Sequence, residues 1–187
     1  GGGGGGGVGG GVGGGGGGVG GGGGGERVGG EAGGRVSVCD GVLVHSLLGA
    51  LKPGERQFFV CGCFMVSPDG RENWLIAETG FPPEQHRLRI PIDLAHPGWV
   101  VRHRQKLILA NTDTNSEFKQ ILKTARMGSA MFAPMFQGER LIGQLICAAQ
   151  ARDTFAEGDL QILAAFAPLA AALYVAHGGL AWLPTLA

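Results

Sequence analysis

The first 25 residues are glycine except for Val8, Val12 and Val19. Glycine has no side chain to bury and more backbone freedom than any other residue, so a true glycine tract would be a flexible coil outside any hydrophobic core. The three valines nevertheless lie four and seven residues apart, which is the spacing of one face of a helix. We interpret this segment as a helix in which glycine stands in for residues that are not identified, and a low-complexity tail is the alternative.

Ordinary globular sequence begins at Arg35, so a core must be built from the residues that follow it. Their number is enough for one domain. The chain has 15 basic and 15 acidic residues and no formal net charge, but this balance says little about partners if the glycines are stand-ins. The basic stretches HRLR and VRHRQK have no aromatic platform or recognition motif beside them. We read them as solvated surface and expect no nucleic-acid partner.

No stretch reaches the roughly 18 uninterrupted apolar residues that span a bilayer, and the longest, residues 162–176, contains Pro168. We expect it to form a buried amphipathic helix, and we expect no membrane segment in this fragment. The four cysteines, at positions 39, 61, 63 and 147, do not have the spacing of a zinc site. Cys61 and Cys63 could bind a metal or sense oxidation from one face of a strand. We interpret them instead as small buried hydrophobes in a reducing cytoplasm.

The pattern of apolar residues and turn signals predicts an ordered set of helices and strands from residue 36 onward. A helix over 36–51 ends at Lys-Pro-Gly, strands over 56–66 and 71–78 form a hairpin, and a third strand covers 86–93. There follow a short helix over 96–105 opened by Pro97, a strand over 106–111, and a helix over 114–125 capped by Asn115 or Ser116. Strands over 129–137 and 140–150 and a long helix over 154–176, with Thr154 as its cap, complete the set. This order predicts an α+β domain.

A series of residues in this pattern carries a family resemblance. The series is Gly98 and Trp99 at a helix start, the strand LILAN, Phe118, the strand SAMFAP with Pro134, Gly143 in LIG, and Phe155 four residues before Asp159. In this order and spacing, from about Arg56 to Ala176, the chain resembles a GAF domain, a small sensory fold.

Two positions depart from the pattern of that family. Asn111 stands where the family usually has an aspartate, and Gly128 stands where it usually has an arginine, although Arg126 lies two residues earlier. A neutral amide cannot replace a carboxylate in an ion pair. We therefore expect the chain to lack one ion pair.

The resemblance implies a GAF/PAS-like fold, in which a central antiparallel sheet of about six strands has the N- and C-terminal helices on one face. Short helices and loops would cover a pocket on the other face. It implies an N-terminal helical extension over residues 1–51, the GAF domain over 52–180 and a C-terminal tail over 181–187. Terminal helices commonly pair two subunits in this family, so we expect a homodimer formed through them.

Other activities of the family fit the sequence less well. At the positions that match the signature of cyclic-nucleotide-responsive members, Gln150, Ala151, Phe155, Asp159 and Leu160, only Phe155 and Asp159 agree. Free methionine-R-sulfoxide reductases and bilin-binding members need cysteines beside the pocket, and no cysteine lies between residues 63 and 147. Haem ligation by His86, His96 or His103 is a further alternative, but we read each as a solvated or hydrogen-bonded loop residue.

The resemblance thus implies a non-catalytic sensory domain of a signal-transduction protein, such as a histidine kinase, cyclase, phosphodiesterase or transcription regulator. It would bind a small molecule, and the sequence names neither that molecule nor any cofactor. The residues expected in the pocket wall are Trp99, Asn111, Phe118, Ser129 and Met131, and no metal ligand or catalytic residue is expected. Each of the five could instead be a core, cap or turn residue. A GAF scaffold that only dimerises is the alternative function.

Overall fold

The computed structural model describes residues 35–39, 42–46, 50–116, 118–121 and 126–187, and for residues 35–46 it describes the backbone alone. The contacts divide the chain between Glu31 and Ala32, and every described residue belongs to the second unit. The glycine-rich residues 1–34, which we interpret as a helix, lie outside the described ranges.

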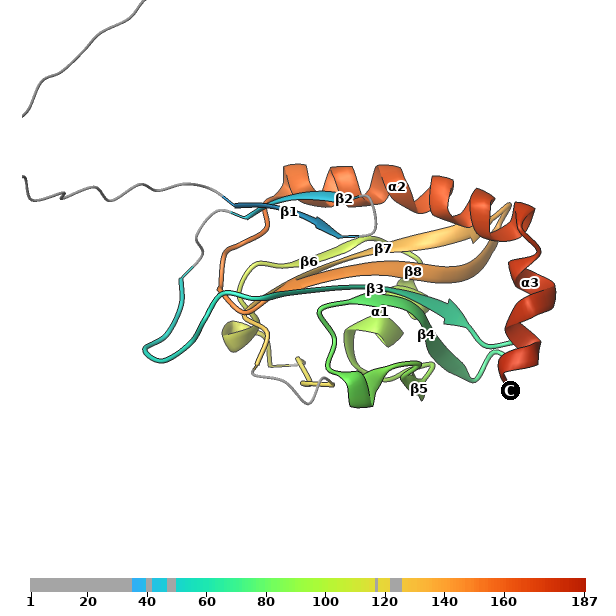
Figure 1. The fold of residues 1–187 in the computed structure, drawn as a ribbon, viewed down its shortest axis with the longest axis horizontal. Coiled ribbons are helices and arrows are strands. Elements are labelled where there is room, and N and C mark those ends of the chain that lie inside the picture. The colour runs from blue at the N-terminus through green and yellow to red at the C-terminus, as the bar shows by residue number, and fades with distance from the viewer. Residues whose placement is uncertain (1–34, 40–41, 47–49, 117, 122–125) are drawn as a thin grey trace, which may run out of the picture. The chain divides into compact units, whose positions relative to one another are not determined.

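The centre of the domain is a six-stranded sheet in the order β5-β4-β3-β8-β7-β6, with every neighbouring pair antiparallel (Figure 1). Its strands are β3 (Phe59–Val66), β4 (Glu72–Thr79), β5 (Arg89–Pro91), β6 (Leu107–Leu109), β7 (Ser129–Gln137) and β8 (Arg140–Ala149). The predicted hairpins are present as β3–β4 and β7–β8. Pairing of β3 with β8 joins them at the middle of the sheet, which confirms the expected α+β fold class and strand number.

Alternation along the strands divides the apolar residues between two cores, one on each face of the sheet. The first core contains Cys61, Met131 and Cys147 and packs against the C-terminal helix. The second contains Val60 and Ile146 and packs against the short helix α1 (Ala95–His103) and the loops around it. The domain therefore has three layers, with the sheet between the long helix and the α1 layer (Figure 1).

The helix α2 (Glu157–Ala176) covers the first face of the sheet. Its inward residues Leu160, Leu163, Ala167 and Ala171 recur at intervals of three and four, which places them on one face. The predicted cap Thr154 does not cap it, because its hydroxyl donates to the Ala151 carbonyl at 2.9 Å. Of the described helices, α2 alone is long and apolar enough to cross a bilayer by length and composition, yet one side of it is packed on the sheet.

The residues after α2 are helical. The helix α3 (Gly179–Trp182) and the 3₁₀ turn η3 (Leu183–Leu186) follow α2, and Leu183 is buried in the same core as the inner face of α2. Tyr174 links α2 to α3, since its hydroxyl donates to the Gly179 carbonyl at 2.7 Å. Burial raises the pKa of Tyr174 to about 12, so the hydroxyl stays a donor at neutral pH.

The helix predicted over residues 36–51 is wrong. The segment contains the antiparallel strands β1 (Arg35–Cys39) and β2 (Val42–Ser46), which pair with each other and run beside α2 (Figure 1). Alternating valines favour a strand over a helix because their χ1 rotation is restricted in a helix. The Asp-Gly pair at residues 40 and 41 is a strong hairpin signal that the helical reading overlooked.

The helix predicted over residues 114–125 is also wrong in its described part. A 3₁₀ turn, η2 (Thr112–Thr114), is followed by non-helical backbone at residues 115, 116 and 118–121. Asn115 has extended dihedral angles and follows η2 as its C-terminal cap, so it does not begin a helix. This segment is held by tertiary hydrogen bonds of Thr112 and Asp113 and not by hydrogen bonds within a helix.

Candidate functional site

A small apolar cavity lies between the sheet and the α1 layer. The sheet contributes Val60 and Phe64 of β3, Ala130 and Phe132 of β7, and Ile146 and Ala148 of β8. His96 and Pro97 of α1, residues 118–121 and Met127 close the other sides. The cavity therefore lies on the face where the family resemblance placed a pocket.

His96 is the buried ionisable side chain of the cavity wall, with an exposed fraction of 5%. Its ring stacks on Phe118 with centroids 5.4 Å apart and on Phe132 with centroids 6.3 Å apart. These distances fall within the usual range of favourable ring contacts. His96 thus joins the loop, α1 and the sheet, and the reading of it as a solvated loop residue is wrong.

The other two histidines do not reach the cavity. His86 is exposed and pairs with Glu78, and His103 is exposed and stacks on Trp99 with centroids 4.2 Å apart. Among the residues that the structure describes, no group of three or more His, Cys, Asp or Glu side chains is placed to hold a metal ion.

The cavity has a volume of about 60 Å³. An apolar cavity that admits benzene has about 150 Å³. A larger guest must therefore displace part of the wall. The part that we expect to move is residues 118–121, a non-helical loop segment that packs against neighbouring side chains.

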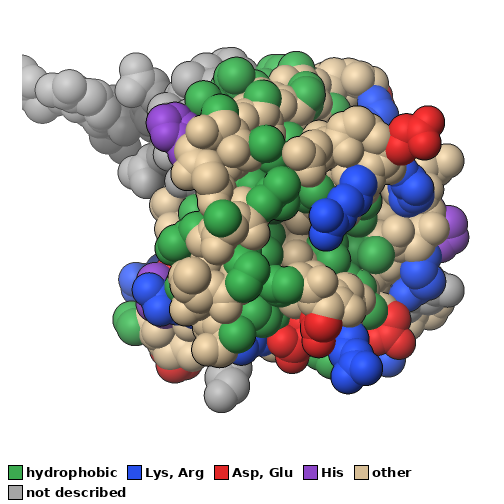
Figure 2. Space-filling model, turned by 90° about the vertical axis from the view of Figure 1, so that its right-hand side faces the viewer, with side chains coloured by type: hydrophobic (Ala, Val, Ile, Leu, Met, Phe, Trp, Pro, Cys, Tyr) green, Lys and Arg blue, Asp and Glu red, His purple; other side chains and the backbone are tan. Residues whose placement is uncertain are grey.

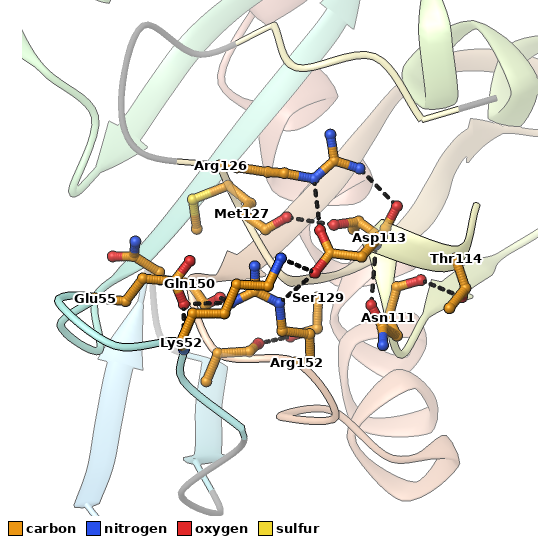
Figure 3. Close-up of polar contacts among 12 residues, drawn as sticks. Lys52, Glu55, Asn111, Asp113, Thr114, Arg126, Met127, Ser129, Gln150 and Arg152 are labelled. Atoms are coloured by element: carbon orange, nitrogen blue, oxygen red, sulfur yellow. Dashed lines mark hydrogen bonds and ion pairs between the residues drawn. The ribbon is translucent and has the colours of Figure 1, made fainter. Parts of the chain in front are cut away.

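A network of charged side chains surrounds Asp113 of η2 (Figure 3). Asp113 of η2 accepts from three cations: Lys52 Nζ at 2.6 Å, Arg126 Nε at 2.9 Å and Arg152 Nε at 2.9 Å. Arg152 is 4% exposed and pairs as well with Glu55. The network joins four segments that are distant in sequence.

An ion pair lies close to the two positions at which the family pattern is broken. Its carboxylate is Asp113, two residues after Asn111, and its guanidinium is Arg126, two residues before Gly128. Asn111 accepts the Asp113 backbone N–H at 2.9 Å and caps η2. Asn111 and Gly128 therefore form no ion pair themselves, while charged residues two positions away form one.

Hydrogen bonds connect the network to the cavity. The Arg126 guanidinium donates to the Thr112 carbonyl at 2.7 Å, and the buried Thr112 hydroxyl donates to the Met127 carbonyl at 2.6 Å. Met127 lines the cavity. The ion pairs therefore position one side of the cavity wall without forming part of it.

The charges of the network shift its pKa values in the directions that hold it together. Hydrogen bonds from Lys52 and Arg152 hold the pKa of Asp113 far below its ordinary value. A hydrogen bond from Arg152 also lowers the pKa of Glu55, and that carboxylate in turn raises the pKa of Arg152. With their pKa values shifted in these directions, Asp113, Glu55 and Arg152 stay charged at neutral pH.

Of the five residues expected in the pocket wall, Phe118 lines the cavity and the other four do not. Trp99 is half-buried on α1 and packs on the second core. Met131 is fully buried in the first core, on the opposite face of the sheet. Ser129 donates its hydroxyl to the Ala151 carbonyl at 2.8 Å, and so, like Asn111, it has a local structural role.

Sequence reasoning missed most of the true wall, which includes His96, Ala130, Ile146 and Ala148. The alternation of side chains along β7 could have identified part of this wall, because Ala130 and Phe132 must face the side of the sheet opposite to Met131. No sequence signal indicated which face the cavity occupies.

The three cysteines with described side chains lie away from the cavity. Cys61, Cys63 and Cys147 face the α2 side of the sheet, where they belong to or pack on the first core. The cavity is on the other side. The strands β3 and β8 therefore separate the thiols from the cavity.

Residues 46–173 match the family model described as "GAF domain". A GAF domain of an Acinetobacter phosphoenolpyruvate-protein phosphotransferase is similar in structure, with 17% identity and a TM-score of 0.58 over 64% of this chain and 72% of that one. A GAF domain/HD domain protein from Geobacter sulfurreducens is 22% identical, with a TM-score of 0.52 over 65% and 82%.

A type II free methionine-R-sulfoxide reductase from Thermoplasma acidophilum is similar too, with 16% identity and a TM-score of 0.54 over 61% of this chain and 77% of that one. At these identities the likeness shows the fold and leaves the activity open. No curated protein matches the sequence.

Proposed function

From the premise that this chain belongs to the GAF domain family, we propose that it is a non-catalytic regulatory domain of a cytoplasmic signalling protein that binds a small molecule in the cavity beside His96. The observation that carries the proposal is the partly open apolar cavity with a buried imidazole in its wall. Concave apolar sites with few polar groups are typical of small-molecule binding.

The arrangement favours a small uncharged ligand. The walls that come from the sheet are aliphatic or aromatic, and the cationic Lys119 at the mouth is exposed. A charged ligand would lose its hydration without a buried counter-ion from these walls. An aromatic guest could replace part of the stacking between His96 and Phe118.

The proposed signal is a displacement of the loop. A guest larger than the 60 Å³ cavity pushes Phe118 and its neighbours outward. Met127 of the cavity wall accepts a hydrogen bond from Thr112, and Thr112 accepts one from Arg126, which pairs with Asp113. Movement of the wall therefore strains the ion-pair network. Arg152 of the network lies five residues before α2, so the strain reaches the start of the C-terminal helix.

Filling the cavity is expected to abolish ligand binding. The variant Ala130→Leu adds three carbon atoms inside the cavity, whereas the same change at the exposed Ala110 adds them outside it. The experiment is a thermal-shift screen of small uncharged metabolites. A ligand at 100 times its Kd stabilises the native chain by about 2.7 kcal/mol, which raises the melting temperature. The increase in melting temperature should persist in Ala110→Leu and disappear in Ala130→Leu.

Three results would contradict the proposal. A screen in which no compound moves the melting temperature, or one in which Ala130→Leu responds like the native chain, would remove the cavity as a binding site. Turnover of free methionine-R-sulfoxide by the native chain would contradict the non-catalytic role. We expect no such turnover, because the described thiols and the cavity lie on opposite faces of the sheet.

The outer side of α2 supports pairing with a second copy. Ile162, Ala165, Leu169, Ala172 and Ala176 are all exposed and recur at alternating intervals of three and four residues, the spacing of a coiled-coil seam. Leu169 is 54% exposed. Figure 2, which faces the end of the molecule where α3 lies, shows further hydrophobic side chains gathered on the surface. We propose that the seam of these five residues forms a homodimer.

A charge in the middle of this seam is expected to separate the two copies. Leu169→Glu should weaken dimerisation about 100-fold, since a central apolar anchor is replaced by a group that must be desolvated. The matched control is Leu180→Glu on α3, an exposed leucine outside the seam. Sedimentation equilibrium measures both. A native chain that is monomeric at high concentration, or equal effects of the two variants, would rule out the seam as the interface.

A further inference from the structure

The sulfur atoms of Cys61 and Cys147 are in contact across the middle of the sheet. The two residues face each other in the antiparallel register of β3 and β8, and their Sγ atoms are 3.2 Å apart. Both side chains are nearly buried, with exposed fractions of 3% and 2%. We propose that Cys61 and Cys147 are a reversible dithiol that a small hydroperoxide oxidises to an intramolecular disulfide.

The geometry requires only a small movement. An S–S bond is about 2.05 Å long, so the two sulfur atoms must approach by about 1.2 Å. Cβ atoms of facing residues in antiparallel strands are about 4.5–5.5 Å apart, and disulfides span about 3.5–4.5 Å between Cβ atoms. These ranges meet, so side-chain rotation and a slight approach of β3 to β8 are sufficient.

The third cysteine in this core is less suited to be the partner. Cys63 lies two residues from Cys61 on the same strand, a separation of about 6.7 Å along the chain, and side chains on one strand stand side by side. Its Sγ atom packs against the Met65 and Met135 Sδ atoms, each at 3.7 Å. Register and contacts therefore select Cys147 as the partner of Cys61.

A groove gives an oxidant access to the pair. The groove lies between the sheet and α2, has a volume of about 470 Å³ and is lined by Cys61, Cys63 and Cys147 together with apolar side chains of α2 such as Leu163 and Phe166. Apolar walls favour a small neutral oxidant such as hydrogen peroxide over the large, charged disulfide of glutathione.

The chemistry balances with one peroxide for each pair. One thiol loses its proton, and the thiolate sulfur attacks a peroxide oxygen; the O–O bond breaks, a sulfenic acid forms and the hydroxide leaving group takes up the proton as water. The second thiol also loses its proton, and its thiolate attacks the sulfenic sulfur. An S–S bond forms, the S–O bond breaks and hydroxide leaves. The proton released by the second thiol converts this hydroxide to water. Two thiols are oxidised and one peroxide is reduced to two waters. A thiol reductant reverses the step by exchange.

The position of the pair is suited to sensing because the neighbouring residues form the other face of the sheet. Val60, Ile146 and Ala148 flank the two cysteines in sequence, and they line the cavity on the α1 side. The disulfide would therefore lie directly behind the cavity wall. It would also link residues 86 positions apart, so oxidation should raise the melting temperature.

The test oxidises the native full chain with hydrogen peroxide, blocks the remaining thiols, and measures the intact mass and the cross-linked peptides. We expect a mass lower by about 2 Da before blocking, which dithiothreitol reverses, a peptide in which Cys61 is linked to Cys147, and a higher melting temperature. Cys61→Ser and Cys147→Ser should abolish the mass loss, and Cys63→Ser should retain it.

The native chain by itself decides the outcome if a serine variant does not fold. A link that involves Cys63 or Cys39, a disulfide between two chains, or sulfinic acid without the expected linked peptide would overturn the proposal. The same oxidation is run on Leu169→Glu, because Leu169 lines the groove and also belongs to the proposed dimer seam. Lack of a Cys61–Cys147 link in both the native chain and this variant would overturn the proposal as well.

Discussion

Replacing Gly128 by alanine is expected to lower the free energy of unfolding by about 3 kcal/mol, because it overpacks a site made entirely of backbone. A Cβ atom at this position would lie 2.2 Å from the Gln150 carbonyl oxygen and 2.8 Å from the Ala151 carbonyl carbon. Both neighbours are held in place, since Gly128 donates its N–H to the Ala149 carbonyl at 2.8 Å and the Gln150 N–H donates to the Phe58 carbonyl at 3.0 Å. Urea unfolding measures the loss.

The control is Gly158→Ala in the first turn of α2. Gly158 is exposed, and a Cβ atom there would have no neighbour within 4 Å. Alanine is the better helix former, so this variant should be as stable as the native chain or more stable by up to about 1 kcal/mol. Equal stability of Gly128→Ala and Gly158→Ala would show that the backbone contact at Gly128 is not tight.

The same contact explains why the arginine of the family pattern is not at position 128. Any side chain there would meet the backbone that connects β8 with α2. Arg126, two residues earlier, is partly exposed and reaches Asp113 from a position that has room for it. An ion pair is therefore present near the position where the family pattern has its arginine, with the charge carried by Arg126.

The second large effect is expected for Asp113→Asn. The amide keeps the shape of the side chain but removes the charge that Lys52, Arg126 and the buried Arg152 share. Leaving a buried guanidinium with one carboxylate fewer costs on the order of 3 kcal/mol. The matched control is Asp153→Asn, the same change at an exposed aspartate one residue after Arg152. It should change the stability by less than about 0.5 kcal/mol.

The pH dependence distinguishes a charge effect from a packing effect. The pKa of Asp113 lies below its ordinary value of 3.8 in the folded chain, so its contribution to stability is fully present above that value. The contribution is lost as the pH falls through the lowered folded pKa. The difference in stability between the native chain and Asp113→Asn should therefore be constant above pH 3.8 and shrink steadily as the pH falls below that value. A difference that is independent of pH would mean that the carboxylate charge is not what stabilises the fold.

The strands were the most predictable part of the fold. β7 and β8 read correctly from sequence because alternating apolar residues and a short polar turn leave few other structures open. The two wrong helices show the limit of that reasoning. Apolar spacing over residues 36–51 is compatible with two periods, and pairing with a neighbouring strand decides between them.

The candidate site was less predictable than the fold. Phe118 could be found because it belongs to the motif series that carries the family resemblance. His96 could not, since its burial depends on Phe118 and Phe132, which are 22 and 36 residues away in sequence. Met131 was misplaced because a buried apolar residue can face either side of a sheet that is covered on both.

The α+β class and the six strands of the main sheet could be predicted from the residue pattern, because local alternation and turn residues act over a few positions. The family could be predicted from an ordered series of motif residues. The face that holds the cavity, the contacts of Asp113 with Arg126 and Arg152, and the pairing of Cys61 with Cys147 are known only from the packed fold. These facts depend on strand register and on contacts between segments tens of residues apart. Such contacts form when the layers pack, and the pattern along any one segment does not encode them.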